Sequence, residues 1–361
     1  PSLELDLYAI NNRISRLLPA GFYYKTFMRP RFLWDWYEGH IRRAAGLGYA
    51  PTEPDSARYD KRNAHCDVLV VGAGPTGLMA ALVAGRSGAR VIVADEQAEM
   101  GGDLLSSTQH VSGVCTWVFL DGLLKELSLL DNVLLLPKST VSGYYDHNFL
   151  VINQRRTDHR SDIDNIIARE RNWRVRARQV VLATGAIERG LVFADNDRPG
   201  IMLSSAVRTY INRYAVRPGR TAAVFTNNDS AYQTAVEMHG AGMEVKGVID
   251  IRQRPSEEQL LQMDALGIPV YSGHGVGGTR SGRQGLRAVE LCRLSPNGRD
   301  VLTHKGSLDC QVLAISGGWN PAIHLHCQSG GRPKYDDRRA CFIPDKSVPV
   351  SYTHLTLPTS D

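Results

Sequence analysis

Residues 66–102 read CDVLVVGAGPTGLMAALVAGRSGARVIVADEQAEMGG, and this stretch decides the fold. Its first apolar run, Val68–Val71, suits a parallel strand that is buried on both faces. Three glycines at GxGxxG spacing follow, and an alanine- and leucine-rich segment then predicts a helix over about Pro75–Ser87, with Gly88 as its stop. A second apolar run, Arg90–Ala94, completes the unit. The order of these parts predicts a dinucleotide-binding βαβ unit in an α/β fold.

Each glycine of the turn has its own physical role. Gly72 permits the tight turn, Gly74 lets the backbone approach a pyrophosphate, and Gly77 lets the helix pack closely on the strand. The amino end of the helix adds free N–H groups and the positive end of its dipole, which favour a diphosphate. The alternative is a turn with a purely structural role. Because the two strands, the helix and the closing Gly101-Gly102 all agree, the nucleotide site is the favoured interpretation.

An acidic residue ends the unit, roughly twenty residues after the glycines. Asp95 stands where a carboxylate accepts hydrogen bonds from an adenosine ribose, and Glu96 is the alternative reader. A carboxylate repels a 2′-phosphate, so we expect NAD or FAD rather than NADP. The predicted cofactor contacts here are Gly72, Gly74, Pro75, Thr76, Gly77, Asp95, Glu96 and Gly102.

Two later strands support the same fold. Residues 178–188, RQVVLATGAIE, predict a strand that ends in Thr184-Gly185, and this resembles the ATG strand of two-dinucleotide-domain flavoproteins. The apolar run Cys310–Ser316 precedes Gly317-Gly318-Trp319 and resembles the second glycine strand of those proteins, which returns the chain to the first domain. Thr184, Gly185, Gly317, Gly318 and Trp319 therefore join the predicted cofactor contacts.

Residues 220–250 repeat the strand–turn–helix–strand pattern without its glycines. The predicted strands are Thr221–Thr226 and Val245–Ile249, and the helix between them is Ser230–His239. The turn reads Asn227-Asn228-Asp229-Ser230, and Asp229 places negative charge where a diphosphate would bind. We therefore expect a degenerate second Rossmann-like fold.

Composition limits the remaining classes of function. The 361 residues carry a net charge of +5, spread along the chain, and the arginines of 155–178 are interrupted by acidic residues, so a solvated surface is favoured over a nucleic-acid site. Six cysteines lack any CxxC pair, which favours reduced thiols, and no metal-ligand spacing occurs; His324-Leu325-His326 is expected in strand or loop. No apolar run is long enough to cross a bilayer and no signal peptide is evident, so a cytoplasmic protein is expected.

The predicted domain organisation has four parts. An arm and linker with short helices occupy 1–62, the first dinucleotide-binding domain takes 63–205 plus 306–345, and the degenerate second domain takes 206–305. Residues 346–361 are expected to be a non-native tail. Within the first domain, Val133–Leu136, Ser142–Tyr145 and Phe149–Asn153 predict a small antiparallel meander, and the glycine-rich 273–285 predicts a hairpin loop.

Several longer phrases resemble the α subunit of heterotetrameric sarcosine oxidase. They are LPAGFYYKTFMRP (18–30), RRAAGLG (42–48), GYYDHN (143–148), ATGAIERGLVFADNDRPGIMLSSAVRTYINRY (183–214) and SGGWNPAIHLHCQSGGRP (316–333). The resemblance implies a multisubunit enzyme that demethylates sarcosine to glycine, forms hydrogen peroxide and passes the one-carbon unit to tetrahydrofolate. It also implies NAD in the first fold of this chain, FAD and the amine site in the β subunit, FMN at the α/β boundary, and further γ and δ subunits. The family's amino-terminal ferredoxin-like and carboxyl-terminal folate-binding segments have no counterpart in these residues.

Other functions stay open at this point. The α subunits of opine oxidases, hydrogen cyanide synthase and dye-linked proline dehydrogenase share parts of these phrases, so the amine is less defined than the enzyme class. The chain is alternatively a non-catalytic scaffold with a permanently bound NAD, or a free-standing FAD-dependent NAD(P)H oxidoreductase. The missing glycines at 227–230 and the absent CxxC argue against the last. No residue has a supported proton-transfer role, so the catalytic residues are unknown.

Overall fold

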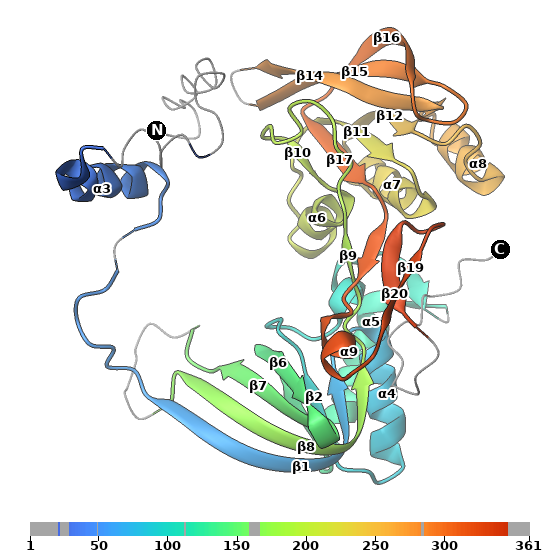
Figure 1. The fold of residues 1–361 in the computed structure, drawn as a ribbon. Coiled ribbons are helices and arrows are strands. Elements are labelled where there is room, and N and C mark those ends of the chain that lie inside the picture. Colours follow the sequence, from blue (N-terminus) through green and yellow to red (C-terminus); the bar gives the residue numbers. More distant parts are fainter. Residues whose placement is uncertain are drawn as a thin grey trace. The chain divides into compact units, whose positions relative to one another are not determined.

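The computed structural model describes residues 21, 29–48, 50–111, 113–158, 167–282 and 285–345. The chain divides into two compact units, Pro1–Ala57 and Arg58–Asp361 (Figure 1). In the first unit a 3-10 turn, η3 (Arg31–Leu33), leads into helix α3 (Trp34–Ala44), where a short helix was expected. The predicted tail, 346–361, lies outside the described residues.

Six strands form the first sheet, in the order β5-β2-β1-β8-β7-β6. Figure 1 shows the long strands β1 and β8 side by side. The predicted βαβ unit is present, because β1 and β2 pair in parallel with α4 between them in the chain. β1 begins earlier than expected, inside the stretch assigned to the linker, because residues 59–66 pair with β8. The three elements are β1 (Tyr59–Val71), α4 (Pro75–Arg86) and β2 (Val91–Ala94).

The predicted pairing of the strand β5 (Val133–Leu136) is wrong. This strand was expected in an antiparallel meander, but it pairs in parallel with β2. The helix α5 (Thr116–Ser128) precedes it, and a strand–helix–strand crossover of this kind gives parallel pairing. The antiparallel part of the sheet consists of β6 (Ser139–Tyr145), β7 (Phe149–Arg155) and the first half of β8 (Glu170–Leu182).

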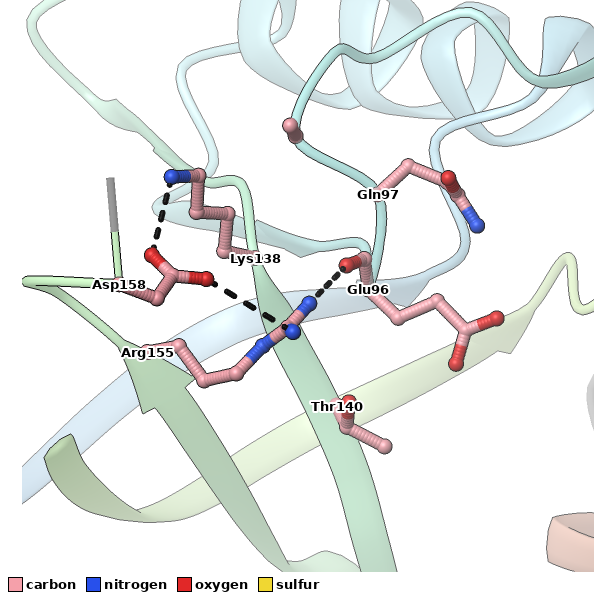
Figure 2. A pocket seen from close by; sticks show the side chains of 7 residues that line it. Glu96, Gln97, Lys138, Thr140, Arg155 and Asp158 are labelled. Carbon is pink, nitrogen blue, oxygen red and sulfur yellow. Dashed lines mark hydrogen bonds and ion pairs between the residues drawn. The ribbon is translucent and has the colours of Figure 1, made fainter. Parts of the chain in front are cut away.

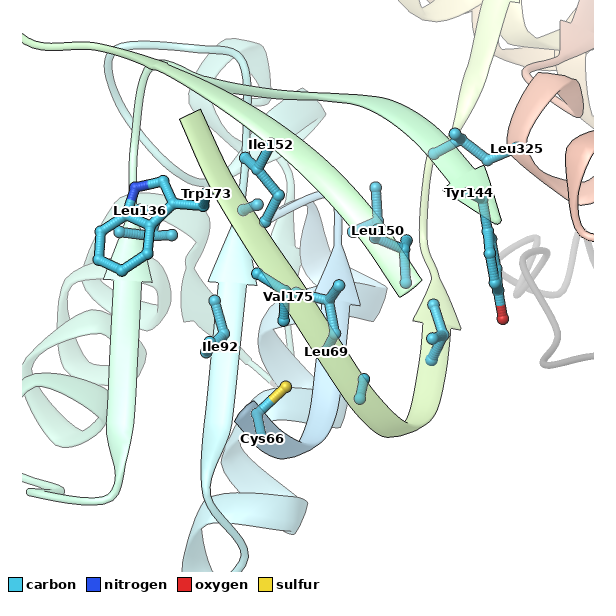
Figure 3. Close-up of a cluster of buried hydrophobic side chains, with 14 of the residues drawn as sticks. Cys66, Leu69, Ile92, Leu136, Tyr144, Leu150, Ile152, Trp173, Val175 and Leu325 are labelled. Carbon is cyan, nitrogen blue, oxygen red and sulfur yellow. The ribbon is translucent and has the colours of Figure 1, made fainter. Parts of the chain in front are cut away.

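Apolar side chains cover both faces of the first sheet. On one face, α4 and α5 bury residues such as Leu78 against Val70. On the other face, the long strands curve so that Trp173 joins one buried cluster with Leu69 and Ile92 (Figure 3). The sheet edge that carries the glycine turn is therefore held from both sides.

A second sheet of five parallel strands has the order β10-β17-β11-β12-β13. The predicted strand–turn–helix–strand repeat is found in β11, α7 and β12. However, β17 pairs with β10 and β11, so the chain leaves the second fold only after Ser316, later than the predicted 306. The strands are β10 (Ile201–Leu203), β11 (Thr221–Thr226), β12 (Glu244–Asp250), β13 (Val270–Ser272) and β17 (Val312–Ser316). The helical segments are α6 (Ser204–Arg208), the π-helical turn η6 (Thr209–Arg213), η7 (Asp229–Ala231), α7 (Tyr232–Gly240) and α8 (Glu257–Ala265).

An antiparallel three-stranded sheet packs on the second fold, and its strands are β14 (His274–Gly282), β15 (Gly285–Leu294) and β16 (Val301–Asp309). The expected loop at 273–285 is therefore largely strand. Two short antiparallel strands, β9 (Ala186–Glu188) and β18 (Trp319–Pro321), lie where the chain passes between the two folds. The remaining elements are η4 (Gly102–Ser106), β3 (His110–Val111), β4 (Val114–Cys115), η5 (Asp146–Asn148), α9 (His324–Gln328), β19 (Pro333–Asp336) and β20 (Cys341–Pro344). The two histidines expected in strand or loop thus lie in the helix α9.

Candidate functional site

The turn after β1 is so tight that two of its positions accept only glycine. Gly72 has a φ of +98°, and a Cβ on it would lie 2.2 Å from the carbonyl oxygen of Ala183. A Cβ on Gly77 would lie 1.8 Å from the carbonyl oxygen of Gly72, so α4 packs directly on the turn. No side chain fits at such distances. These two glycines are therefore required by the turn itself.

Gly74 is different, because its surroundings are open. It is the N-cap of α4 with a φ of −73°, and a Cβ on it would meet no atom within 4 Å. Pro75 has no amide hydrogen, and the first turn of α4 leaves the amides of Thr76 and Gly77 without an intrahelical acceptor. Gly102 closes in from one side, since a Cβ on it would lie 2.9 Å from the Gly74 Cα. The open space at Gly74 and the helix end fit an anionic group.

Asp95 follows β2 directly, and its carboxylate holds the glycine turn. Oδ2 accepts a hydrogen bond from the Ala73 amide at 2.6 Å, and Oδ1 accepts one from the Gln97 amide at 2.8 Å. Each carboxylate oxygen has a second lone pair, so the group can accept ribose hydroxyls as well. Asp95 is half-buried, whereas Glu96 is exposed. The structure thus brings Asp95, rather than the Glu96 carboxylate, to the glycine turn.

A polar hollow of about 660 Å³ is lined in part by the residues that directly follow Asp95 in the sequence. Figure 2 shows the Arg155 guanidinium between Asp158 and Glu96: Nη1 lies 3.7 Å from Asp158 Oδ2, and Nη2 donates to the Glu96 carbonyl at 3.2 Å. The Lys138 ammonium pairs with Asp158 at 3.0 Å. No sequence pattern indicates this hollow, because Arg155 has the character of a solvated surface arginine and its neighbours meet only through strand pairing. The lining residues are Glu96, Gln97, Ala98, Lys138, Thr140, Arg155 and Asp158.

Thr184 and Gly185 lie at the carboxyl edge of the first sheet. The Thr184 hydroxyl donates to the Ala322 carbonyl at 2.7 Å, and the Ala322 amide donates to the Gly185 carbonyl at 3.0 Å. Gly185 has a φ of +66°, and a Cβ on it would meet no atom within 4 Å. Since Ala183 already touches Gly72, this turn and the glycine turn lie together. Open α/β sheets bind their ligands at this edge.

Gly317, Gly318 and Trp319 lie where the chain passes between the folds. The Gly317 amide donates to the Arg189 carbonyl at 2.7 Å, and Arg189 Nε donates back to the Gly317 carbonyl at 2.7 Å. Arg189 also donates to two carbonyls between β19 and β20. The Trp319 indole donates to Ser230 Oγ at 3.1 Å. The Trp319 bond ties the passage to the second fold, and none of these bonds reaches the glycine turn. No sequence pattern indicates the role of Arg189.

In the second fold the corresponding acidic residue, Asp250, is hydrogen-bonded to side chains of that same fold. Asp250 ends β12 as Asp95 follows β2, and it is fully buried. It accepts a hydrogen bond from the Tyr232 hydroxyl at 2.8 Å and one from Arg252 Nη2 at 2.8 Å. The same Arg252 nitrogen lies 2.7 Å from Asp229 Oδ1, in the turn that would hold a diphosphate. Burial and the adjacent carboxylate raise the pKa of Tyr232, so this hydroxyl stays a donor.

A buried carboxylate joins the two folds. Glu237 on α7 accepts hydrogen bonds from Arg208 Nε at 2.9 Å and from Asn212 Nδ2 at 2.7 Å. It also accepts one at 3.2 Å from Thr108 Oγ1, which belongs to the first fold. The side chains of Arg208 and Glu237 are only 12% and 3% exposed. No local pattern could reveal this group, because Thr108 and Glu237 are 129 residues apart.

The described residues hold no group of three metal-ligating side chains. None of the helices in these ranges is long and apolar enough to span a membrane. All six cysteines are free; Cys115 and Cys327 are exposed, and Cys66, Cys292, Cys310 and Cys341 are buried.

A family model described as FAD dependent oxidoreductase matches residues 67–184. The chain is 43% identical over 349 residues to sarcosine oxidase subunit alpha of Rhizobium meliloti (strain 1021). The aligned residues make up 96% of this chain and 34% of that protein. It is 42% identical over 306 residues to the protein of the same name from Corynebacterium sp. (strain P-1), covering 84% of this chain and 31% of that protein. The crystal structure of L-proline dehydrogenase from P. horikoshii superposes with a TM-score of 0.59 at 20% identity, over 82% of this chain and 50% of that chain.

These similarities confirm the predicted fold class. The family match runs from the end of β1 to the Thr184 turn, which is the segment that carries the glycine turn and Asp95. The likeness to the solved dehydrogenase shows the same α/β fold. The chain spans about a third of the length of the curated relatives it matches.

Proposed function

Because this chain is a relative of the sarcosine oxidase α subunits over 96% of its length, we propose that it supplies the dinucleotide-binding part of an oxidoreductase of that type. The single observation that carries the proposal is the first βαβ unit. It combines a turn that only glycine can form, an open helix end beside Gly74, and Asp95 fixed against that turn. The family match to residues 67–184 supports the same segment.

The dinucleotide proposed for this site is NAD. Gly74 and the amides of Thr76 and Gly77 would face its diphosphate, and Asp95 would accept the hydroxyls of its adenosine ribose. Thr184 and Gly185 would border its other end at the carboxyl edge of the sheet. A bound dinucleotide of this kind supplies hydride transfer, while these residues bind and orient it. FAD is the alternative occupant of the same residues.

The complete activity is proposed to be shared between subunits. In this proposal a β subunit holds FAD and oxidises sarcosine, FMN lies at the boundary with this chain, and γ and δ subunits complete the complex. Glycine, hydrogen peroxide and a one-carbon unit passed to tetrahydrofolate are the proposed products, and a cytoplasmic location is proposed as the sequence leads us to expect. The contribution of this chain is positioning and electrostatics.

The second fold argues against a free-standing NAD(P)H oxidoreductase. Such an enzyme would need a nicotinamide nucleotide in the second fold as well as a flavin in the first. Asp250 is buried beneath Tyr232 and Arg252, and Asp229 with Arg252 takes up the turn of that fold. One dinucleotide per chain is therefore proposed.

The first test is to denature the purified chain and identify any released dinucleotide by mass spectrometry. NAD supports the proposal, whereas FAD would transfer it to the flavin-binding relatives. A second measurement adds the purified β subunit and sarcosine and follows reduction of the bound nucleotide. Turnover without any change in that nucleotide would contradict a redox role and favour the scaffold alternative, and sarcosine oxidation by this chain alone would contradict the shared activity.

A further inference from the structure

A second polar hollow, of about 580 Å³, lies on the three-stranded sheet of the second fold, and the function proposed above does not use it. Arg280, Ala288 and Asp309 stand opposite one another in register across the three strands. The central Ala288 has no side chain beyond Cβ, so the longer flanking side chains border a depression. Arg198 lines it from the segment between β9 and β10. The other lining residues are Thr279, Ser281, Arg287 and Ser307.

Three arginines line this hollow, and two of them are bonded to carboxylates outside the lining. Arg198 Nη2 donates to Asp195 at 2.6 Å, and Arg280 Nε lies 3.2 Å from Glu290. Each arginine keeps further N–H groups for a ligand. Arg287 has no carboxylate partner among the described residues. Three arginines and one aspartate line the hollow, and Asp195 and Glu290 beside it offset the charges of Arg198 and Arg280.

Unsatisfied polar atoms mark the same place. Within the described ranges three buried side-chain nitrogen or oxygen atoms have no hydrogen-bond partner, and two of them, Arg198 Nε and Thr279 Oγ1, belong to residues of this lining. Buried donors and hydroxyls are rarely left unpaired, because their desolvation is then uncompensated. Ser281 and Ser307 add two more hydroxyls to the lining. The lining therefore offers more hydrogen-bond donors than acceptors, with Asp309 as its one carboxylate.

The segment that carries Arg198 is fixed in advance. The Pro199 carbonyl accepts a hydrogen bond from the Leu286 amide at 2.8 Å, and a Cβ on Gly285 would lie 2.5 Å from that oxygen. The Gly200 carbonyl accepts one from the Leu313 amide at 2.9 Å. Two sheets thus hold this loop, so ordering it costs a ligand little binding free energy.

The geometry points to a binding site for the phosphoryl group of a small anionic molecule in this hollow. A phosphoryl dianion has several acceptor oxygens and can be bound by several guanidinium N–H groups and hydroxyls at once, whereas one arginine already matches a carboxylate. Arg287 is the arginine of the lining whose positive charge neither Asp195 nor Glu290 offsets. The site is separate from the glycine turn, because all its residues belong to β14, β15, β16 and the loop before β10.

Inorganic phosphate is the probe for this site, titrated calorimetrically into the complete chain at constant ionic strength. Arg287→Ala removes one guanidinium and is expected to weaken phosphate binding about tenfold or more. Thr279→Val removes a hydroxyl at nearly constant shape and is expected to weaken it about threefold. The matched control is Arg299→Ala, an exposed arginine between β15 and β16 that does not line the hollow. This control should bind phosphate like the wild type.

Thermal unfolding of the Thr279→Val variant separates binding from structure. Its hydroxyl has no partner in the described structure, so the melting temperature should stay equal or rise while phosphate affinity falls. A lower melting temperature with unchanged affinity would assign Thr279 a structural role and overturn the inference. Absence of phosphate binding, or equal affinity in Arg287→Ala, would also overturn it. Succinate that binds as tightly as phosphate would refute the assignment to a phosphoryl group.

Discussion

Asp95 bonds to the glycine turn and, in the proposed function, also to the ribose. In Asp95→Ala the amides of Ala73 and Gln97 lose their acceptor, and the ribose loses a charged partner. We expect dinucleotide affinity to fall by about 1.5–3 kcal/mol, roughly 10- to 150-fold, as for hydrogen bonds to a charged group. Calorimetric titration with NAD measures this loss.

Glu96→Gln is the matched control for Asp95→Ala. The Glu96 side chain is exposed, and its carboxylate makes no hydrogen bond within the described part of the chain. We expect NAD affinity within about twofold of the wild type, since no charged hydrogen bond is lost. A loss equal to that of Asp95→Ala would assign the ribose contact to Glu96.

Glu237→Gln tests the buried carboxylate between the folds. The substitution keeps the shape of the side chain but leaves the Arg208 guanidinium buried without its counter-charge. Removing one partner of a buried pair costs about 3–5 kcal/mol, and urea denaturation measures the free energy of unfolding. The control Glu244→Gln removes a carboxylate that is 64% exposed, and it should cost less than about 0.5 kcal/mol. Similar losses in both variants would contradict this account.

The glycine turn and the helix α4 can be tested as one element through two substitutions of the same kind. In Gly77→Ala the new Cβ meets the Gly72 carbonyl, and we expect the free energy of unfolding to fall by more than about 3 kcal/mol. In Gly74→Ala the new Cβ enters open space at an ordinary φ, so stability should stay within about 1 kcal/mol. NAD binding should nevertheless be lost. Normal NAD binding by Gly74→Ala would show that no phosphate approaches this position.

The existence of the main elements could be predicted from the sequence, whereas the pairing of the strands β5 and β17 could not. The run Val133–Leu136 is apolar and short, which fits a parallel and an antiparallel neighbour equally well. Its partner is decided by the helix before it. The strand β17 was likewise recognised but assigned to the first domain, because its partner Ala223 lies 90 residues earlier, opposite Leu313. The glycine turn could be predicted because its parts are neighbours in the chain.

In the candidate site, too, contacts within one βαβ unit could be predicted from the sequence, whereas contacts between distant elements could not. The Asp95 contact to the turn joins residues within one βαβ unit, so spacing alone predicted their proximity. Arg189, Glu237 and Asp250 act through partners on other elements, and each residue type is ordinary for a solvated surface. Position in a folded network, rather than residue identity, gives them their roles.

At the level of the whole molecule, buried thiols make the stability of the folded chain fall at alkaline pH. Burial raises the pKa of Cys66 to about 11 and that of Cys310 to about 12. In the unfolded chain thiols ionise near pH 8.5. Between these values the folded chain retains protons that the unfolded chain has released, so the free energy of unfolding falls as the pH rises. Below about pH 8 these thiols leave stability independent of pH.

Urea denaturation from about pH 7 to pH 10.5 measures this dependence. Each raised thiol contributes up to about 1.4 kcal/mol per pH unit above its unfolded pKa. The double variant Cys66→Ala, Cys310→Ala should therefore lose stability less steeply above pH 9 than the wild type does. The exposed pair Cys115→Ala, Cys327→Ala is the control and should keep the wild-type slope. Equal slopes in all three proteins would contradict the role of the buried thiols.

The buried acidic residue of the second fold, Asp250, limits how far protein engineering can restore a nucleotide site there. A designer who placed glycines in the turn 227–230 would remove Asp229, yet Asp250 would still be bonded to Tyr232 and Arg252. Replacing Tyr232 and Arg252 alone would leave a buried carboxylate without partners, which is itself strongly destabilising. Neither change alone gives a stable protein with a second nucleotide site, so the turn and the partners of Asp250 must be changed together. The asymmetry between the folds is thus protected against gradual reversal, and sequence libraries that vary the turn alone should not yield a second nucleotide site.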